Sequence, residues 1–222
     1  DIVDINMGCP VPKVVSQGAG AALLKNPARV GEIIRTVKAA VKIPVTLKTR
    51  SGWDKENINV IEIAKIAEAE GAAAIALHPR TRSMGHSGRP DWSIIGEVKA
   101  AVKIPVIGNG GIETPEDSKI MLDQTGCDYV MIGSATVGNF HLIKQTIHYL
   151  ETGELLPDLS VHEKIQMALD HARENCIYWG EPKGPREMRK IFPGYLKGFA
   201  GASELRKQLN TAETLVEIEH IL

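Results

Sequence analysis

The chain has 222 residues, of which 43% are hydrophobic and 24% charged, and its formal net charge is −1. This length allows one large domain, or one domain with a small appendage. No run of about 18 apolar residues occurs, so the sequence predicts no membrane span, and the whole-chain charge gives no support for a nucleic-acid partner.

Cys9, Cys127 and Cys176 are the three cysteines, and they lie far apart without C-x-x-C spacing. An odd, scattered set argues against a disulfide framework and against a zinc site. Unpaired thiols suit a reducing compartment, so we expect a cytoplasmic protein that holds no metal.

Short apolar strands alternate with amphipathic helices along the first 150 residues. Strands are expected at residues 2–5, 45–48, 74–77, 105–107 and 129–132. Helices are expected at 27–41, around 61–67, at 93–101, from 115 onward and near 139–150. Asn26 and Thr114 each precede a proline, which is typical of a helix N-cap followed by proline in the first turn.

An internal repeat supports this alternation. The octapeptide Lys-Ala-Ala-Val-Lys-Ile-Pro-Val occupies residues 38–45 and returns at 99–106. The copies are about 60 residues apart, which equals two βα units of roughly 30 residues each. We therefore interpret the repeat as structural and not functional: in each copy a helix ends and the next strand begins.

Five βα units with apolar strands predict a parallel sheet covered by helices. Polar clusters follow every strand, as in a TIM barrel, whereas a doubly wound sheet binds its ligand at one switch point. Five units cannot close an eight-stranded barrel, so about three units are expected before Asp1. We expect a partial barrel at residues 1–153 and a small helical domain at 154–222.

The stretch Asn6-Met7-Gly8-Cys9-Pro10 follows the first strand and forms a turn bounded by glycine and proline. Side chains at the carboxyl end of such a strand can face a ligand. Cys9 is therefore a candidate proton-donating thiol, and the alternative is a small buried residue.

Glycine-rich loops end the last two strands, at Gly108-Asn109-Gly110-Gly111 and at Gly133-Ser134. Glycines let backbone N–H groups approach an anion, and each loop leads to a helix N-terminus. We expect a phosphate site there, with simple tight turns as the alternative.

Cationic and titratable side chains end the second and third strands. Lys48 closes an apolar strand, where burial is costly without an anionic or electron-rich partner, and the alternative is a lysine that reaches solvent. His78 either contacts a ligand or is a core histidine whose hydrogen bonds are made within the protein. The basic loop that carries Arg80, Arg82 and Arg89 contacts phosphate or is simply solvated.

Five ordered segments together resemble the tRNA-dihydrouridine synthases, most closely the bacterial B-type branch. They are residues 4–14 (DINMGCPVPKV), 48–53 (KTRSGW), 78–82 (HPRTR), 108–111 (GNGG) and 131–134 (MIGS). The resemblance extends through residues 186–190 and 195–198 near the C-terminus.

This resemblance implies an FMN-dependent oxidoreductase that reduces tRNA uridines to 5,6-dihydrouridine, with NADPH as the reductant. Hydride would pass from reduced FMN to C6 of an extruded uracil, and Cys9 would donate the proton to C5. Asn6 would help to place the uracil. The expected flavin contacts are Lys48 and His78, with Asn109, Gly110, Gly111, Gly133 and Ser134 at its phosphate.

The resemblance also implies tRNA contacts from basic residues. The candidates are Arg80, Arg82, Arg186, Arg189, Lys190 and Lys197. The sequence departs from the family pattern at Ser134, where arginine is usual, and also at Gly111, His86 and Ile191.

Three alternatives remain open from the residues. One is another FMN-dependent TIM-barrel enzyme that acts on a free pyrimidine. The second is a non-catalytic RNA-binding fragment, and the third is a flavin-free phosphate-binding isomerase or lyase barrel. The sequence does not specify an oligomeric state or the uridine that is reduced.

Overall fold

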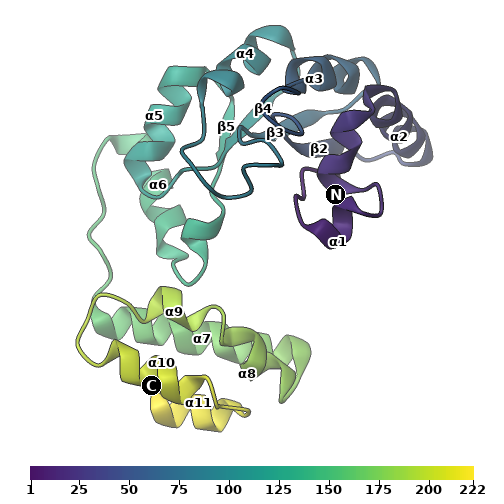
Figure 1. Cartoon of the computed structure of the whole chain (residues 1–222). Helices are drawn as coiled ribbons and strands as arrows, with labels where there is room; N and C mark the ends of the chain where they lie inside the picture. Colours follow the sequence, from purple (N-terminus) through teal and green to yellow (C-terminus); the bar gives the residue numbers. More distant parts are fainter. The chain divides into compact units, whose positions relative to one another are not determined.

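The computed structural model describes all residues from Asp1 to Leu222, and the chain divides into two compact units. The first unit comprises Asp1–Gly133 and the second Ser134–Leu222. In Figure 1 the first unit is coloured purple to teal and the second green to yellow. Each unit has a hydrophobic core of its own.

A parallel sheet of five strands forms the centre of the first unit. The strands are β1 (Val3–Met7), β2 (Val45–Arg50), β3 (Ala74–His78), β4 (Val106–Asn109) and β5 (Tyr129–Met131). They follow one another in sequence order, β1-β2-β3-β4-β5. Because consecutive right-handed crossovers that all step the same way put every helix on one face, this order is that of part of a TIM-type barrel. The predicted α/β class is confirmed.

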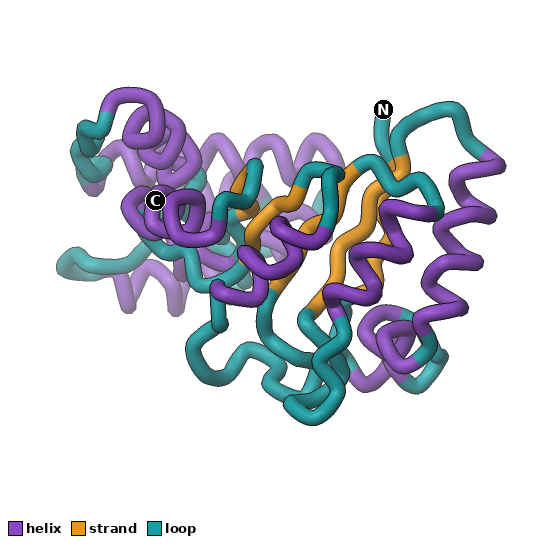
Figure 2. The backbone as a smooth tube through the Cα atoms, turned by 90° about the horizontal axis from the view of Figure 1, so that it is seen from above, coloured by secondary structure: helices purple, strands orange, loops and turns teal.

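Helices cover one face of this sheet, as Figures 1 and 2 show. They are α2 (Pro27–Ala40), α3 (Val60–Ala69), α4 (Ser93–Ala101) and α5 (Pro115–Thr125), whereas α1 (Pro12–Val15) and the 3-10 helix η1 (Gly20–Lys25) belong to the connection between β1 and α2. The four longer helices α2 to α5 pack side by side in chain order. Both predicted caps are confirmed, since Asn26 Oδ1 accepts the Arg29 N–H and Thr114 forms a capping box with Asp117.

The two faces of the sheet differ in chemistry. Leu47, Ile75 and Val106 are fully buried in the core that faces the helices. Their neighbours alternate to the other face, because successive side chains of a strand point in opposite directions. That other face carries Asn6 and Lys48, so polar side chains collect on it.

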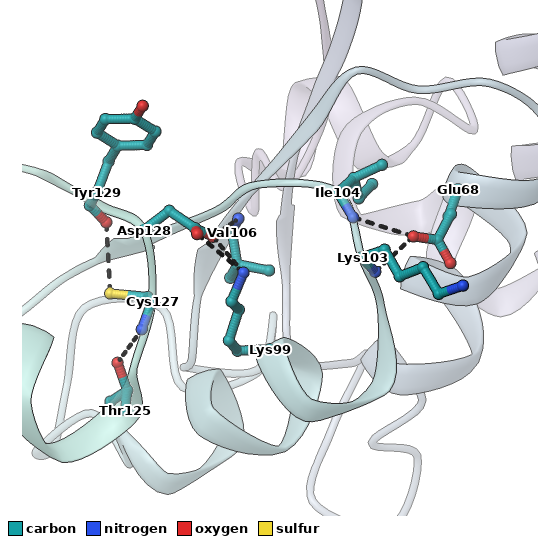
Figure 3. Close-up of polar contacts among 9 residues, drawn as sticks. All are labelled: Glu68, Lys99, Lys103, Ile104, Val106, Thr125, Cys127, Asp128 and Tyr129. Atoms are coloured by element: carbon teal, nitrogen blue, oxygen red, sulfur yellow. Dashed lines mark hydrogen bonds and ion pairs between the residues drawn. The ribbon is translucent and has the colours of Figure 1, made fainter.

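The repeated octapeptide forms the same structure twice. In each copy a helix ends, a valine with extended backbone follows (Val41 and Val102), and a strand begins at the last valine. In the second copy, carboxylates from neighbouring elements hold the strand entrance, as Figure 3 shows. Glu68 Oε1 accepts the Ile104 N–H at 3.0 Å, and Asp128 Oδ2 accepts the Val106 N–H at 2.8 Å.

The second unit is entirely helical. Its elements are the 3-10 helix η2 (Ser134–Thr136), α6 (His141–Thr152), α7 (Val161–Trp179), α8 (Lys183–Met188), α9 (Phe192–Tyr195), α10 (Ala202–Leu209) and α11 (Leu215–Ile221). Two of these helices contain a proline near their start, Pro185 in α8 and Pro193 in α9. A proline in the first turn of a helix loses no hydrogen bond, so it does not exclude a helix there.

Backbone contact explains why α6 belongs with the C-terminal helices. A Cβ on Gly194 would lie 2.1 Å from the Val137 oxygen, and a Cβ on Gly138 would lie 2.5 Å from the Ile191 oxygen. The segment before α6 therefore packs directly on α9. The division into functional domains at residues 153 and 154 stays a prediction.

Replacing Asp128 by alanine tests the strand entrance of Figure 3. The carboxylate bonds both the Val106 N–H and Lys99 Nζ, at 2.8 and 2.7 Å. Its loss leaves a backbone donor unpaired, so we expect a decrease of roughly 1–3 kcal/mol in the free energy of unfolding, measured by urea denaturation. The matched control is Asp123→Ala, which removes only an exposed pair with Lys119 and is expected to cost less than ~0.5 kcal/mol.

The effect of Asp128→Ala on stability should depend on pH, which offers a way to contradict this role. The Lys99 ammonium and the Val106 N–H hold the pKa of Asp128 below its ordinary value. A carboxyl with a lowered folded-state pKa stabilises the fold above about pH 4 and loses that contribution as pH falls through the folded value. Equal effects of Asp128→Ala at pH 7 and pH 3 would contradict this role.

Candidate functional site

The polar ends of the strands meet at one edge of the sheet. Asn6 lies beside Lys48 in the β1–β2 pairing, and Arg50 lies beside His78 in the β2–β3 pairing. Asn109 ends the next strand and pairs with Met131. Because parallel strands share a carboxyl edge, four predicted site residues (Asn6, Lys48, His78 and Asn109) are brought to this edge.

The loop after β1 holds Cys9 by its backbone. Asn6 Oδ1 accepts the N–H groups of Gly8 and Cys9, at 3.1 and 3.0 Å. The Cys9 carbonyl accepts the Ala21 N–H at 3.0 Å. A Cβ on Gly20 would lie 2.7 Å from that carbonyl oxygen, so only glycine allows this approach. The loop is fixed while the half-buried Cys9 thiol is free of any disulfide.

Arg50 is a site residue that sequence reasoning missed as an individual. Its side chain is 4% exposed, and its Nε donates to the Gly8 oxygen at 3.0 Å. Its Nη1 donates to the carbonyl oxygens of Thr81 and Gly85, at 2.9 and 2.7 Å. Arg50 therefore joins the Cys9 loop to the loop after β3. Its position two residues after Lys48, on the same strand face, is the signal that could have found it.

Electrostatics at Arg50 reflects crowding of like charges. Burial lowers the pKa of the guanidinium, and the charge of Arg80 lowers it further, whereas a negative charge on Cys9 would raise it. The arginine stays charged at neutral pH, because its ordinary pKa is above 12. A buried positive charge thus faces the Cys9 loop.

Lys48 lies half-buried on the polar face and has no ion pair in the structure. Burial lowers the pKa of its ammonium group most, Arg50 lowers it further, and Asp4 opposes both. Asp4 is itself bonded by Thr46 Oγ1 at 2.7 Å. A desolvated cation without a carboxylate partner fits an electron-rich or anionic ligand.

His78 is neutral at physiological pH. It is 7% exposed, and burial is the main cause that lowers its pKa to about 4. His78 Nδ1 lies 3.1 Å from the Asn109 carbonyl oxygen, which can only accept, so we assign the proton to Nδ1. Nε2, which is 3.4 Å from Arg80 Nη1, is then the acceptor.

The Asn109–Gly111 loop fits closely against this histidine. A Cβ on Gly110, whose φ is +101°, would lie 2.0 Å from His78 Nδ1. The Gly110 carbonyl accepts Trp92 Nε1 at 2.9 Å, and Asn109 Nδ2 donates to the Met131 oxygen at 2.7 Å. A Cβ on Gly111 would also be too close to Pro90, at 2.7 Å. The loop is a preformed, glycine-lined backbone surface.

Of the last predicted phosphate residues, Gly133 ends the first unit and Ser134 begins η2 of the second. The loop residue Gly133 follows β5 by two positions, at the same carboxyl edge as Asn109. The role of both residues at a phosphate stays a prediction.

Two of the three arginines in the 80–90 loop are engaged by the protein. Arg80 Nε and Nη2 donate to the Gly88 oxygen, at 3.0 and 2.6 Å. The Arg82 guanidinium lies 4.7 Å from the Trp53 ring centroid, and Lys25 Nζ lies 3.7 Å from the same centroid. Cation–π contacts thus connect the loops after β1, β2 and β3.

In the helical unit, most of the predicted tRNA contacts have protein partners. Arg186 pairs with Glu213 at 2.7 Å, and Lys190 pairs with Glu187. Arg189 Nη2 donates to the Ala212 oxygen at 3.0 Å. Of the four candidates in this unit, Lys197 is the one that is exposed and free of an ion pair. The expected basic patch is therefore partly neutralised by acids.

No group of three or more His, Cys, Asp or Glu residues is placed to hold a metal ion. The structure also contains no helix with the length and apolar character that a membrane crossing needs.

The residues at the sheet edge fit a flavin phosphate group and ring. The unpaired Lys48 and the neutral His78 offer a donor and an acceptor on the polar face. Gly110 and Gly111 carry no Cβ and pack directly against His78 and Pro90, so their bare backbone forms the surface beside the imidazole. These features suit a planar, electron-rich ring that carries an anionic tail.

We expect His78 to stay neutral well below pH 6.5 in an NMR titration of its imidazole resonances. Because the folded-state pKa is below the unfolded value of about 6.5, protonation favours the unfolded chain, and stability is lost as pH falls from about 6.5 to 4. His78→Gln removes this part of the pH dependence. A His78 resonance that titrates near pH 6.5 would show that the ring is not desolvated.

Arg50→Met tests the link between the two loops. The variant leaves three carbonyl groups without their donor, so we expect the free energy of unfolding to decrease by roughly 3 kcal/mol. We also expect Cys9 to react faster with a thiol reagent, measured in a Cys176→Ala background. Arg29→Met, which removes only an exposed pair with Glu32, is the control and should change neither quantity. Unchanged Cys9 reactivity in Arg50→Met would mean that Arg50 does not hold the loop.

Comparisons with known proteins identify the family of this chain. The family model described as dihydrouridine synthase (Dus) matches residues 1–222. A tRNA-dihydrouridine synthase B of Vibrio vulnificus is 45% identical over 212 residues, which cover 96% of this chain and 66% of that protein. A tRNA-dihydrouridine synthase B of Pseudomonas aeruginosa is 44% identical over 209 residues, which cover 94% of this chain and 63% of that protein.

The chain thus spans slightly less than two thirds of these curated relatives. Among solved structures, a mandelate oxidase with an FMN adduct is similar over 97% of this chain and 77% of that chain, at 14% identity and a TM-score of 0.40, a likeness too slight to add to the assignment. The match of the family model along the whole chain is decisive. The chain belongs to the dihydrouridine synthase family.

Proposed function

We propose that the chain carries the active-site edge of an enzyme that reduces uridines in tRNA to 5,6-dihydrouridine. The observation that carries this proposal is the Cys9 loop, held by Asn6 and Arg50 beside Lys48 and the neutral His78. A fixed loop with a reachable thiol suits a general acid, because such a group must be positioned within hydrogen-bond reach of the atom it protonates.

Reduction of a uracil ring adds a hydride to C6 and a proton to C5. FMN, reduced by NADPH, supplies the hydride for C6 when it is bound. The Cys9 thiol donates the proton to C5. Asn6 holds the turn that aims this thiol, and its Nδ2 is available to place the uracil.

The remaining residues of the site bind the flavin. Lys48 and His78 contact the flavin, and the glycine-lined backbone of Asn109, Gly110 and Gly111, together with Gly133 and Ser134, holds its phosphate. The target base leaves its stack to reach this edge, since the ring cannot be approached within the folded RNA.

Basic residues of each unit contact the tRNA backbone. In the first unit these are Arg80 and Arg82, and in the second Arg186, Arg189, Lys190 and Lys197. The reaction is placed in the cytoplasm, where three unpaired thiols stay reduced.

Cys9→Ala tests the proton-donor role. We expect dihydrouridine formation to fall about 10²- to 10⁴-fold, the usual contribution of a general acid, with flavin and tRNA binding unchanged. Product is measured by mass spectrometry of digested tRNA, and flavin by its visible spectrum and its bleaching with NADPH. Cys176→Ala is the matched control and should retain full product yield.

Because the chain spans about two thirds of its relatives, the assay uses both the 222-residue chain and a fusion to the segment of a B-type relative that this chain does not match. Product yield that is equal in wild type and Cys9→Ala would falsify the proton-donor role. Turnover of a free pyrimidine without retention of tRNA would instead support an enzyme for small substrates.

A further inference from the structure

A polar cavity of about 190 Å³ lies within the helical unit. It is bounded by the start of α6, the first turns of α7 and the segment that follows α9. His141, Asp158, Lys164 and Lys197 are among the residues that line it. At ~30 Å³ per water molecule, the cavity holds about six waters, which is room for a phosphate group that keeps part of its hydration.

Two of the lining residues are lysines without an ion pair. Lys164 is half-buried and Lys197 is exposed, and neither lies within 4.0 Å of a carboxylate oxygen. Arg173, Arg186 and Lys190 of this unit pair with acids, and other lysines without an ion pair, such as Lys207, do not line this cavity. Two unpaired ammonium groups on one cavity repel each other unless an anion lies between them.

The acidic side chains near the cavity are already engaged. Asp158 Oδ1 accepts from Gln145 Nε2 at 3.2 Å, which fixes the connection between α6 and α7. Glu163 Oε2 accepts from the Ser160 N–H at 2.8 Å and completes the capping box of α7. Asp158 thus holds a side-chain amide and Glu163 holds the N-terminus of α7, and neither carboxylate forms an ion pair with the two lysines.

Tight packing makes the cavity wall rigid. Gly138 and Gly194, which both line it, belong to the two segments that pack backbone to backbone. Tyr195, also in the wall, has its hydroxyl 3.2 Å from His171 Nδ1. A preformed wall lowers the ordering cost of binding, because little conformational freedom is lost.

We propose that this cavity binds one phosphate group of an RNA backbone, held jointly by Lys164 and Lys197. The inference rests on the proposed function for the class of ligand, RNA, and adds to it a defined site and the residue Lys164. A single enclosed phosphate also fixes the register of the RNA, since phosphate contacts position a nucleic acid without reading its sequence.

The test measures the affinity of the 222-residue chain for tRNA by fluorescence anisotropy between 50 and 200 mM salt. The variants are Lys164→Gln, Lys197→Gln and their combination, with Lys207→Gln on the exposed face of α10 as the control. Each phosphate that is neutralised contributes about 0.7–0.9 to the slope of log K against log salt. Because both lysines bind the same phosphate, we expect the double variant to reduce the magnitude of this slope by about 0.7–0.9, the contribution of one phosphate, and not by twice that amount.

Each single variant should weaken binding several-fold, and Lys207→Gln should not change it. Melting temperatures check that all variants are folded. A second arm adds inorganic phosphate at constant ionic strength, which should compete with tRNA on the wild type but not on the double variant.

Several results would overturn the inference. If the double variant reduced the magnitude of the salt slope by the contribution of two phosphates, the two lysines would make independent surface contacts. A second outcome is that the double variant binds tRNA as the wild type does but no longer shows a rise in melting temperature when phosphate is added. The cavity would then be a site for free phosphate, and the proposed function would stand. Absence of any tRNA binding by the wild type would overturn both the inference and the proposed tRNA substrate.

Discussion

Parallel pairing of five strands in chain order is the constraint on which the candidate site depends. Each strand ends at the same edge, so residues that are between 22 and 42 positions apart in sequence become neighbours there. Asn6 and Lys48 meet in this way, and so do Arg50 and His78. Without this register, the Cys9 loop would have no cationic or imidazole neighbours.

Burial of positive charge gives the site its chemical character. Besides burial, the charge of Arg50 lowers the pKa of Lys48, the charge of Arg80 lowers that of Arg50, and all three cations lower that of His78. The imidazole gives up its proton first, because its ordinary pKa is lowest of these groups. The result is a neutral acceptor among cations, an environment that favours an anionic or electron-rich ligand. Burying these cations lowers the stability of the fold unless acceptors bond to them. Arg50 has such acceptors, because it donates to three carbonyl oxygens.

The helical unit distributes its charges differently. Exposed arginines of this unit pair with glutamates from distant segments, as Arg173 does with Glu219 on α11 and Arg186 with Glu213 just before α11. Such exposed pairs add little stability, but they reduce the local positive field. Of the cations in this unit that have no ion pair, Lys164 and Lys197 line the same cavity. Binding of RNA by this unit would then depend on a few positions.

Local sequence determined the five strands, the capped helices at Asn26 and Thr114, and the position of Cys9 in a turn after the first strand. These features follow from periodicity and from backbone chemistry over a few residues. The tertiary structure alone decided the role of Arg50, the pairing of Arg186 with a residue 27 positions away, and the cavity between α6, α7 and α9. No local pattern specifies them, because each arises from contacts between segments that only folding brings together.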